Sequence, residues 1–570
     1  MPPGMQDPWL AHYDKGVPAT IASYPDKTLV DFVREHARRR PRAVAVTFKT
    51  TRLTFAQLDG LSDALAVALA GLGLKKGDRL GLVLPNAPQF LIAELAAWKL
   101  GAIVAPQNPL YTARELEDSF AASRPDIVVT LTAFYERVKQ AQAKGGYRLV
   151  VATSIKEYLP PLLRLLFTLL KERREGHRVT LRPGDAWLQP LIHQGESATA
   201  PSPAAAPSDP AVILMSGGTT GTPKGVVSDH RGLVQSGTQL LAWLREPLAG
   251  KNPSIMLPLP LFHTYGCAGA QPMTVIAGIP LQLVPNPRDV SDLLKTIERE
   301  RPAILCGVPT LFSAILNHPR VAAGRVDLSS ISGCFSGAAA LMAETKRRFE
   351  ALTGGRIVEG YSLTEATMAC CVNPFGGVNK PGSIGVPICD VRAKVVDAER
   401  GKGELPAGEI GEILIGAPQL MKGYWGNPAE TALVLEPAAD GPWLHTGDLG
   451  YMDEDGYLFV VDRKKDLIKA SGFQVWPREI EEVIAGHPGV AEVGVAGVPD
   501  ERKGEAIQAW VVLRAGATVS EDELRAFCRE KLAPFKVPRR IRFVPDLPKT
   551  MVGKVLRRVL VEQALGEMRA

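Results

Sequence analysis

Residues 216–225 read Ser216-Gly217-Gly218-Thr219-Thr220-Gly221-Thr222-Pro223-Lys224-Gly225, and the apolar run at 211–215 before them predicts a short buried strand. Four glycines in ten residues leave the backbone free to point several N–H groups at one anion. The hydroxyls add donors, and the lysine adds a point charge. The stretch therefore predicts a phosphate-binding loop, with a plain flexible surface loop as the alternative. It differs from the nucleotide P-loop because glycine, not a hydroxyl residue, follows the lysine.

The composition indicates a large protein of a reducing compartment. The chain has 570 residues, 46% of them hydrophobic, so we expect more than one domain. The net charge of +6 comes from interspersed charges of both signs, so we expect no nucleic-acid partner. Seven scattered cysteines without a C-x-x-C pair argue against zinc and disulfides. With neither a signal-peptide pattern nor an apolar run of the ~18 residues that a membrane span needs, we expect a cytoplasmic location.

Strand and helix patterns alternate over most of the chain. Strands are predicted at 43–48, 79–83, 102–105 and 126–130, and helices at 28–38, 55–72, 87–100 and 113–122. Such alternation predicts a mostly parallel sheet with helices on its faces. Short strands and glycine turns at 391–461 indicate a small β-rich subdomain. The chain beyond 463 predicts a compact unit that ends in a helix near 554–565.

The segment from Leu159 to Lys171 departs from this pattern. After two prolines it is almost entirely Leu and Phe, and its few polar residues recur at helical spacing as one narrow stripe. A wide apolar face that ends in basic residues predicts peripheral contact with an anionic membrane surface. The equally weighted alternative is a helix packed on the protein body or in a dimer interface.

The 216–225 loop resembles that of the adenylate-forming acyl-CoA synthetases (AMP-binding enzymes), in particular their long-chain fatty acid branch. The resemblance implies an α/β fold: a large N-terminal domain, 1–462, of two α/β subdomains plus a small β-rich subdomain. A small mobile α+β C-terminal domain, 463–570, follows a hinge near Lys465. The implied enzyme is a long-chain fatty acid–CoA ligase. It converts a fatty acid and ATP to acyl-adenylate and pyrophosphate, and then transfers the acyl group to CoA with release of AMP.

The family motifs imply ATP, Mg²⁺ and CoA as cofactors and co-substrates, and they assign roles to individual residues. The loop residues that would bind the β- and γ-phosphates are Ser216, Gly217, Gly218, Thr219, Thr220, Gly221 and Lys224. Gly360-Tyr361-Ser362-Leu363-Thr364-Glu365 resembles the motif Y-G-x-T-E, with Ser362 in place of glycine. There, Tyr361 and Thr364 would contact the nucleotide, and Glu365 with Thr219 would hold magnesium and take part in catalysis.

Three further motifs complete the implied nucleotide and CoA sites. Gly337 and Ala338 lie in a run of small residues that would form a wall against adenine. Thr446-Gly447-Asp448 and the charged run after residue 461 would supply Asp448 and Arg463 to the ribose. Gly472 would let pantetheine pass. Pro548-Lys549-Thr550-Met551-Val552-Gly553-Lys554 would project Lys554, the catalytic lysine, onto the reacting carboxylate and α-phosphate.

Phe262-His263, at the end of a predicted strand, implies an apolar acid as substrate. His263 would border the acyl and carboxylate site and take part in catalysis. Amino-acid-activating relatives carry an aspartate at this place for the substrate's ammonium group. Alternatives that share the motifs are a medium-chain or aromatic acid–CoA ligase and a fatty acyl-AMP ligase that acts on a carrier protein. A non-catalytic acyl-binding protein is a further alternative. The resemblance also implies a homodimer.

Overall fold

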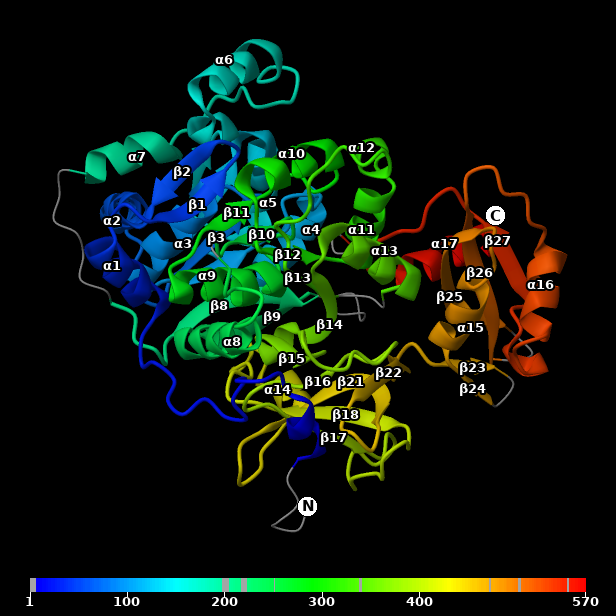
Figure 1. Ribbon diagram of the computed structural model, residues 1–570. Helices are drawn as coiled ribbons and strands as arrows, with labels where there is room; N and C mark the ends of the chain where they lie inside the picture. The colour runs from blue at the N-terminus through cyan, green and yellow to red at the C-terminus, as the bar shows by residue number, and fades with distance from the viewer. Residues whose placement is uncertain are drawn as a thin grey trace.

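The computed structural model describes residues 7–196, 204–216, 223–250, 252–337, 341–470, 473–500, 504–550 and 553–569. Figure 1 shows a large α/β body and, at its right, a smaller unit drawn in orange and red. We call this smaller unit, formed by the elements after β22 (Leu458–Arg463), the C-terminal unit. The predicted fold class is thus confirmed, while the boundary at 462 and the hinge near Lys465 stay predictions.

Two large mixed sheets form the body. The nine-stranded sheet has the order β16 (Val386–Pro387), β15 (Met368–Val372), β14 (Arg356–Leu363), β13 (Gly333–Ser336), β12 (Ile304–Gly307), β10 (Ile255–Leu257), β11 (Leu281–Leu283), β1 (Val44–Phe48), β2 (Thr51–Thr54). The eight-stranded sheet has the order β19 (Gly423–Tyr424), β9 (Lys224–Asp229), β8 (Pro210–Ser216), β4 (Ile103–Pro106), β3 (Arg79–Val83), β5 (Ile127–Leu131), β6 (Leu149–Thr153), β7 (Ala186–Trp187). The central pairings are parallel, as predicted, and the antiparallel ones lie toward the edges.

Helices cover and join these sheets. The body helices are α1 (Leu29–Arg39), α2 (Phe55–Gly71), α3 (Pro88–Lys99), α4 (Ala113–Ser123), α5 (Tyr135–Gly145), α6 (Pro161–Leu170), α7 (Leu188–Gly195), α8 (His230–Trp243), α9 (Gln271–Ala277), α10 (Val290–Glu300), α11 (Pro309–Leu316), α12 (Pro319–Ala322), α13 (Ala343–Thr353) and α14 (Pro428–Val434). Threonine capping boxes start α1, α2 and α4, which is why these helices begin where the sequence predicts. Helix α3 is buried along its whole length. Just before it, the Asn86 amide donates to the carbonyls of Leu257 (3.0 Å) and Leu259 (2.8 Å), which ties the two sheets together.

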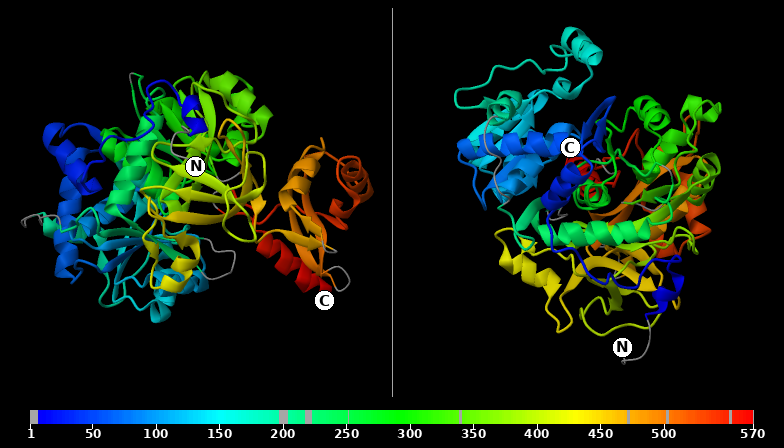
Figure 2. Two further views of the ribbon diagram at one scale, coloured as in Figure 1. Left: turned by 90° about the horizontal axis from the view of Figure 1, so that it is seen from below. Right: turned by 60° about the vertical axis from the view of Figure 1, so that its left-hand side comes forward.

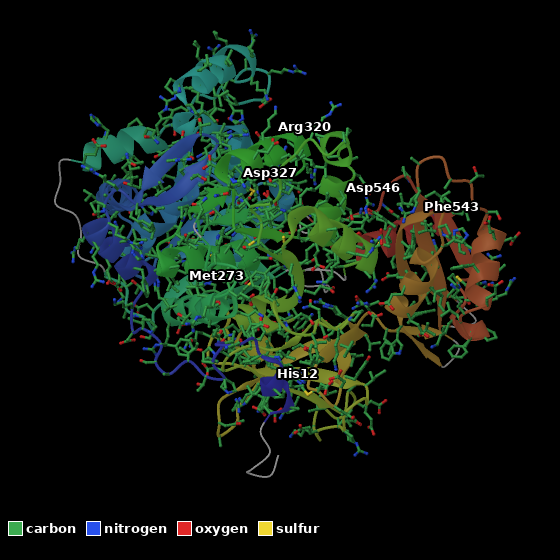
Figure 3. The ribbon with its side chains drawn as sticks, viewed as in Figure 1. His12, Met273, Arg320, Asp327, Phe543 and Asp546 are labelled. Carbon is green, nitrogen blue, oxygen red and sulfur yellow. The ribbon has the colours of Figure 1, made fainter. Side chains whose placement is uncertain are left out.

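The β-rich subdomain and the C-terminal unit each have a five-stranded sheet. The first contains β17 (Arg392–Val396), β18 (Gly411–Gly416), β21 (Trp443–Met452), β20 (Leu435–Glu436) and β22. The second contains β24 (Phe473–Val475), β23 (Ile468–Ala470), β26 (Gly504–Leu513), β25 (Val490–Asp500) and β27 (Arg540–Phe543), with helices α15 (Pro477–Ala485), α16 (Glu521–Arg529) and α17 (Arg557–Arg569). Its core is separate from that of the body. Figure 2 shows this unit beside the body, and Figure 3 marks Met273 on α9 in the body and Phe543 at the end of β27.

No helix within the described ranges is both long and apolar enough to cross a bilayer. The predicted helix at 159–171 forms as α6, which projects from the body at the top of Figure 1.

Candidate active site

The phosphate-loop residues at the two ends of the glycine-rich stretch face each other. Strands β8 and β9 form an antiparallel pair in which Ser216 is the partner of Lys224. Gly217, Gly218, Thr219, Thr220 and Gly221, which were assigned to the same loop, lie outside the described residues. The hairpin thus brings the end of a buried strand and a lysine to the two sides of one loop.

Lys224 makes an ion pair that was not foreseen from the sequence. Its Nζ lies 2.5 Å from Glu430 Oε2 and 5.1 Å from the centroid of the Tyr424 ring. Lys224 and Glu430 are 206 residues apart in the chain, so no local sequence signal could pair them. The Glu430 carboxylate forms an ion pair with the Lys224 ammonium, which is the kind of contact that a phosphate oxygen would make.

Glu365 lies in the same neighbourhood, in a turn that follows β14. The Tyr424 hydroxyl donates to Glu365 Oε1 at 3.1 Å, so Tyr424 contacts both Glu365 and Lys224. The Met421 amide donates to the Glu365 carbonyl (2.9 Å), and that of Thr367 donates to the Thr364 carbonyl (3.0 Å), which fixes the turn. Thr367 and the residue after it both have positive φ, at 52° and 112°, so the backbone behind Glu365 is strained.

The groups around Glu365 fit magnesium. Its carboxylate is a hard oxygen ligand. Lys224, which contacts the same Tyr424 side chain, would neutralise phosphate charge nearby. Within the described ranges no cluster of three or more His, Cys, Asp or Glu side chains could hold a metal ion by itself. Mg²⁺ is usually held by one or two carboxylates together with substrate phosphates, and Glu365 would supply one such carboxylate. The second assigned ligand, Thr219, lies outside the described residues.

Tyr361, Asp448 and Arg463 form one hydrogen-bonded network, in which Asp448 is buried and the other two residues are partly buried. The Tyr361 hydroxyl donates to Asp448 Oδ2 at 2.5 Å, and Arg463 Nε lies 2.9 Å from Asp448 Oδ1. Burial and the adjacent carboxylate raise the pKa of Tyr361, so the phenol stays protonated. Burial opposes the charge of Arg463, but Asp448 and neighbouring anions outweigh it and raise the pKa of the guanidinium. The Asp448 carboxylate keeps acceptor capacity beyond these two contacts.

An open pocket of about 260 Å³ lies next to this network, lined by Thr446, Gly447, Arg463, Lys464 and Lys465. Burial, together with the charge of Arg463, lowers the pKa of Lys465. A cationic pocket beside an acceptor-only carboxylate suits a ligand that combines hydroxyl groups and phosphate.

The C-terminal unit brings Lys554 to this place. The lysine is exposed at the surface, and desolvation by the neighbouring protein, followed by the charge of Arg463, lowers its pKa to about 8. Asp448 and Asp466 oppose this shift, and Lys465 adds to it. Lys554 thus lies near enough to Asp448, Arg463 and Lys465, which were assigned to the same site, for their charges to act on its pKa. Gly472, assigned to the CoA step, lies outside the described residues.

His263 and Gly337 both lie next to Tyr265. His263 Nδ1 accepts from the Tyr265 amide (3.2 Å), and burial lowers the pKa of His263 to about 4, so the imidazole is neutral. A Cβ added at Gly337 would lie 3.4 Å from the Tyr265 ring and 3.7 Å from the Gly360 carbonyl oxygen, which are ordinary contact distances, so the space at this position would also accept a small side chain. Ala338 lies outside the described residues.

The prediction that His263 ends a strand is wrong. Strand β10 ends at Leu257, and the chain then turns before a π-helix over Tyr265–Ala270. The two Pro residues at 258 and 260 explain the early end, because proline lacks the N–H group that a sheet ladder needs. Single-turn π-helices are rare and are frequently found at functional sites. The sequence gives no signal for this one.

Comparisons with known proteins cover nearly the whole chain. The AMP-binding enzyme family matches residues 33–425, and the AMP-binding enzyme C-terminal domain matches residues 479–554. The chain is 39% identical over 561 residues to a long-chain-fatty-acid–CoA ligase of Bacillus subtilis (strain 168), with 98% of each chain covered. It is 34% identical to a ligase of the same name from Escherichia coli O6:H1, with 99% of each covered.

The fold is also that of ATP-bound MatB from Rhodopseudomonas palustris, with a TM-score of 0.79 at 31% identity over 94% of this chain and 99% of that one. The apo form of MatB gives a TM-score of 0.69 at the same identity and coverage. Both structures are of MatB, so the difference in TM-score reflects their conformations. This chain is more similar in overall structure to the ATP-bound form than to the apo form.

Proposed function

The chain belongs to the AMP-binding enzyme family, and we propose that it is a long-chain fatty acid–CoA ligase. It activates a fatty acid with ATP to an acyl-adenylate and transfers the acyl group to CoA. The observation that carries the proposal is the position of Lys554. Lys554 belongs to the C-terminal unit, yet the charges of Asp448 and Arg463 on the body act on its pKa. The fatty acid carboxylate and the α-phosphate of ATP would meet at this place.

In the first half-reaction, a carboxylate oxygen of the fatty acid attacks the α-phosphorus of ATP. The bond from that phosphorus to the bridging oxygen breaks, and pyrophosphate leaves. The 216–221 loop and Lys224 hold the β- and γ-phosphates, Asp448 and Arg463 hold the ribose, and Gly337 with Tyr361 holds the adenine. The Lys554 ammonium stabilises the charge that develops between carboxylate and α-phosphate. Catalysis is then positioning plus electrostatics, as in phosphoryl transfer in general.

Mg²⁺, held by Glu365 and Thr219, would neutralise part of the phosphate charge. The ion pair of Lys224 with Glu430 supports a role of Lys224 in phosphate binding, because the lysine already binds an anionic oxygen in this structure. Thr364 belongs to the turn that presents Glu365.

In the second half-reaction, the C-terminal unit rotates about Lys465, so that Lys554 withdraws and Gly472 faces the site. The CoA thiolate attacks the acyl carbonyl, and AMP leaves with the electron pair of the acyl–oxygen bond. The neutral His263, whose Nδ1 already accepts a hydrogen bond, is assigned to the border of the carboxylate site rather than to proton transfer.

The substrate assignment rests on the surroundings of His263. Phe262 and His263 stand where an ammonium-binding carboxylate would be needed for an amino acid. The π-helix that follows is buried in each of its six residues, which suits an apolar acyl chain. The names of the curated relatives support the same substrate class. A cytoplasmic location and a homodimer remain parts of the proposal.

Pyrophosphate release from ATP, measured with palmitate, octanoate and coumarate and with or without CoA, tests the function. We expect CoA-dependent turnover that is strongest with palmitate. A preference for octanoate or coumarate would keep the mechanism and reject the long-chain substrate. Pyrophosphate release without any formation of acyl-CoA would point to a carrier-protein ligase, and no release with any acid would reject the enzyme assignment.

A further inference from the structure

Helix α6 is oriented with its polar stripe toward the protein and its leucines toward solvent. On the inner side, Arg164 Nε donates to the Lys156 carbonyl at 3.0 Å, and the same guanidinium bonds the Glu157 carbonyl. Lys156 Nζ lies 3.4 Å from Thr168 Oγ1 and 2.6 Å from Glu172 Oε1. These contacts hold the helix to the body through its polar residues. An amphipathic helix of a globular protein normally does the reverse.

The outer side of α6 is made of six leucines. Their exposed fractions are 68% for Leu162, 41% for Leu163, 55% for Leu165, 42% for Leu166, 71% for Leu169 and 68% for Leu170. Phe167 alone among the apolar side chains of this helix is buried, packed edge-on against His177 with 5.0 Å between ring centroids. The helix is the outermost part of the body at the top of Figure 1 and at the top of the right-hand view in Figure 2. The alternative that these leucines pack on the protein body is therefore wrong.

Basic side chains flank this leucine face. Between residues 161 and 182 the chain has six Lys or Arg residues and two Glu residues. Glu172 is paired with Lys156, and Glu175 lies 3.3 Å from Lys171. Arg173, Arg174 and Arg178 are exposed. The apolar face thus has a positively charged border.

We propose that the leucine face of α6 (the six leucines above) with its basic border docks the protein on an anionic lipid surface. A convex face of leucines on a projecting helix fits a deformable apolar layer, because such a layer can cover all six side chains together. The basic border matches the negative headgroups of such a surface. Docking itself requires only the exposed leucines and the basic border, whereas its use in collecting membrane-dissolved substrate rests on the proposed function.

A second copy of this chain fits the face less well. Two leucine faces that met would also bring their basic borders together, and like charges would oppose the contact. The lipid surface is therefore the occupant that both the apolar and the charged residues favour.

Co-sedimentation of the full chain with vesicles tests the proposal without any substrate. We expect the protein to pellet with vesicles of equal parts phosphatidylglycerol and phosphatidylcholine, and to pellet less at high salt or with phosphatidylcholine alone. The double variant Leu165→Ser/Leu169→Ser should lower this binding by about tenfold or more. Arg173→Glu/Arg174→Glu should weaken binding to the anionic vesicles in particular.

Leu352→Ser, at a leucine on α13 that is 46% exposed, is the matched control and should bind like the unaltered protein. Thermal unfolding at the same midpoint shows that each variant is folded. The proposal is overturned if the unaltered protein stays in the supernatant, or if the double serine variant pellets as well as the control. It is also overturned if that variant changes a dimer to a monomer in light scattering while lipid binding is absent. Since no ATP or acid is present, failure here is distinct from failure of the ligase assignment.

Discussion

Gly553 of the C-terminal unit packs against Thr310 of α11, and a Cβ added at Gly553 would lie 3.2 Å from Thr310 Oγ1. Gly553 also has φ +79°, a conformation that favours glycine. Because the next residue is Lys554, we expect a change at this contact between the two parts of the protein to displace the lysine relative to Asp448 and Arg463.

Gly553→Ala should therefore slow adenylation by roughly tenfold to a hundredfold, because a displacement of about 1 Å at a reacting group has that order of effect. The rate of thioester formation from supplied acyl-adenylate should stay the same. Gly516→Ala is the matched control, since Gly516 has the same φ of +79° and nothing near its Cβ position. Equal effects of both variants on adenylation would mean that backbone strain, and not the contact with Thr310, is responsible.

Lys554→Ala should reduce adenylation by at least about a hundredfold, because it removes the charge that stabilises the transition state. Supplied acyl-adenylate should still be converted to acyl-CoA. Single-turnover measurement of each half-reaction checks this. Lys549→Ala is the control, because Lys549 is held within the C-terminal unit by Glu492 and Asp546. Equal losses in both half-reactions would contradict the role given to Lys554.

The pKa of Lys554 predicts a fall in adenylation at alkaline pH. Burial lowers this pKa to about 8, below the ordinary 10.5, and only the protonated amine carries the charge that the reaction needs. The kcat/KM for pyrophosphate release should therefore fall as pH rises through about 8. Lys554→Arg keeps the charge and should move this fall to higher pH. An unchanged profile in that variant would assign the titration to another group.

The sequence was sufficient for the local parts of the fold. Alternating patterns predicted β3, α2 and α4 within a residue or so, because threonine caps and apolar runs are local signals. The motifs around Lys554, Asp448 and Arg463 assigned all three residues to one nucleotide site, and these roles stay predictions. What it could not predict are pairings between distant segments, such as Lys224 with Glu430 and Tyr424 with Glu365.

The orientation of α6 is a further feature that the sequence could not decide. The heptad-like stripe with Arg164 and Thr168 is the same whether the stripe faces solvent or the body. The orientation follows from tertiary contacts: Lys156 pairs with Glu172, and its carbonyl accepts a hydrogen bond from Arg164. These contacts hold the polar side of the helix against the body, so that the leucines face solvent. The early end of β10 before the π-helix likewise depends on its tertiary surroundings as well as on the prolines.

The ion pair between Lys224 and Glu430 predicts competition with ATP. Phosphate must displace Glu430 from the lysine, so Glu430→Gln should lower the KM for ATP by roughly twofold to fivefold, the range expected for a partly exposed ion pair. Lys224→Ala should instead raise this KM. Glu298→Gln on α10 controls for the loss of one surface charge. A higher KM for ATP in Glu430→Gln would show that Glu430 helps to bind the nucleotide.

The burial of Glu94 predicts that the free energy of unfolding depends on pH. It is fully buried on α3, accepts from the Gln271 amide and lies 3.7 Å from Cys267 Sγ, and burial raises its pKa to about 8. The folded protein thus holds this proton more tightly than the unfolded chain, whose carboxyl has the ordinary value of 4.5. The resulting stabilisation is complete below pH 4.5 and is lost as pH rises to about 8, with a slope of at most about 1.4 kcal/mol per pH unit.

Glu94→Gln should remove this slope, because a glutamine fills the same space and does not titrate in this range. Urea unfolding followed by tryptophan fluorescence between mildly acidic and mildly alkaline pH measures it, since Trp98 lies one turn further along α3. The unaltered protein should lose stability relative to Glu94→Gln as the pH rises, and the two curves should diverge most near pH 8. Glu344→Gln, at an exposed site on α13, should keep the slope of the unaltered protein. Parallel curves for Glu94→Gln and the unaltered protein would mean that Glu94 is ionised in the folded state, and that a counter-charge reaches it.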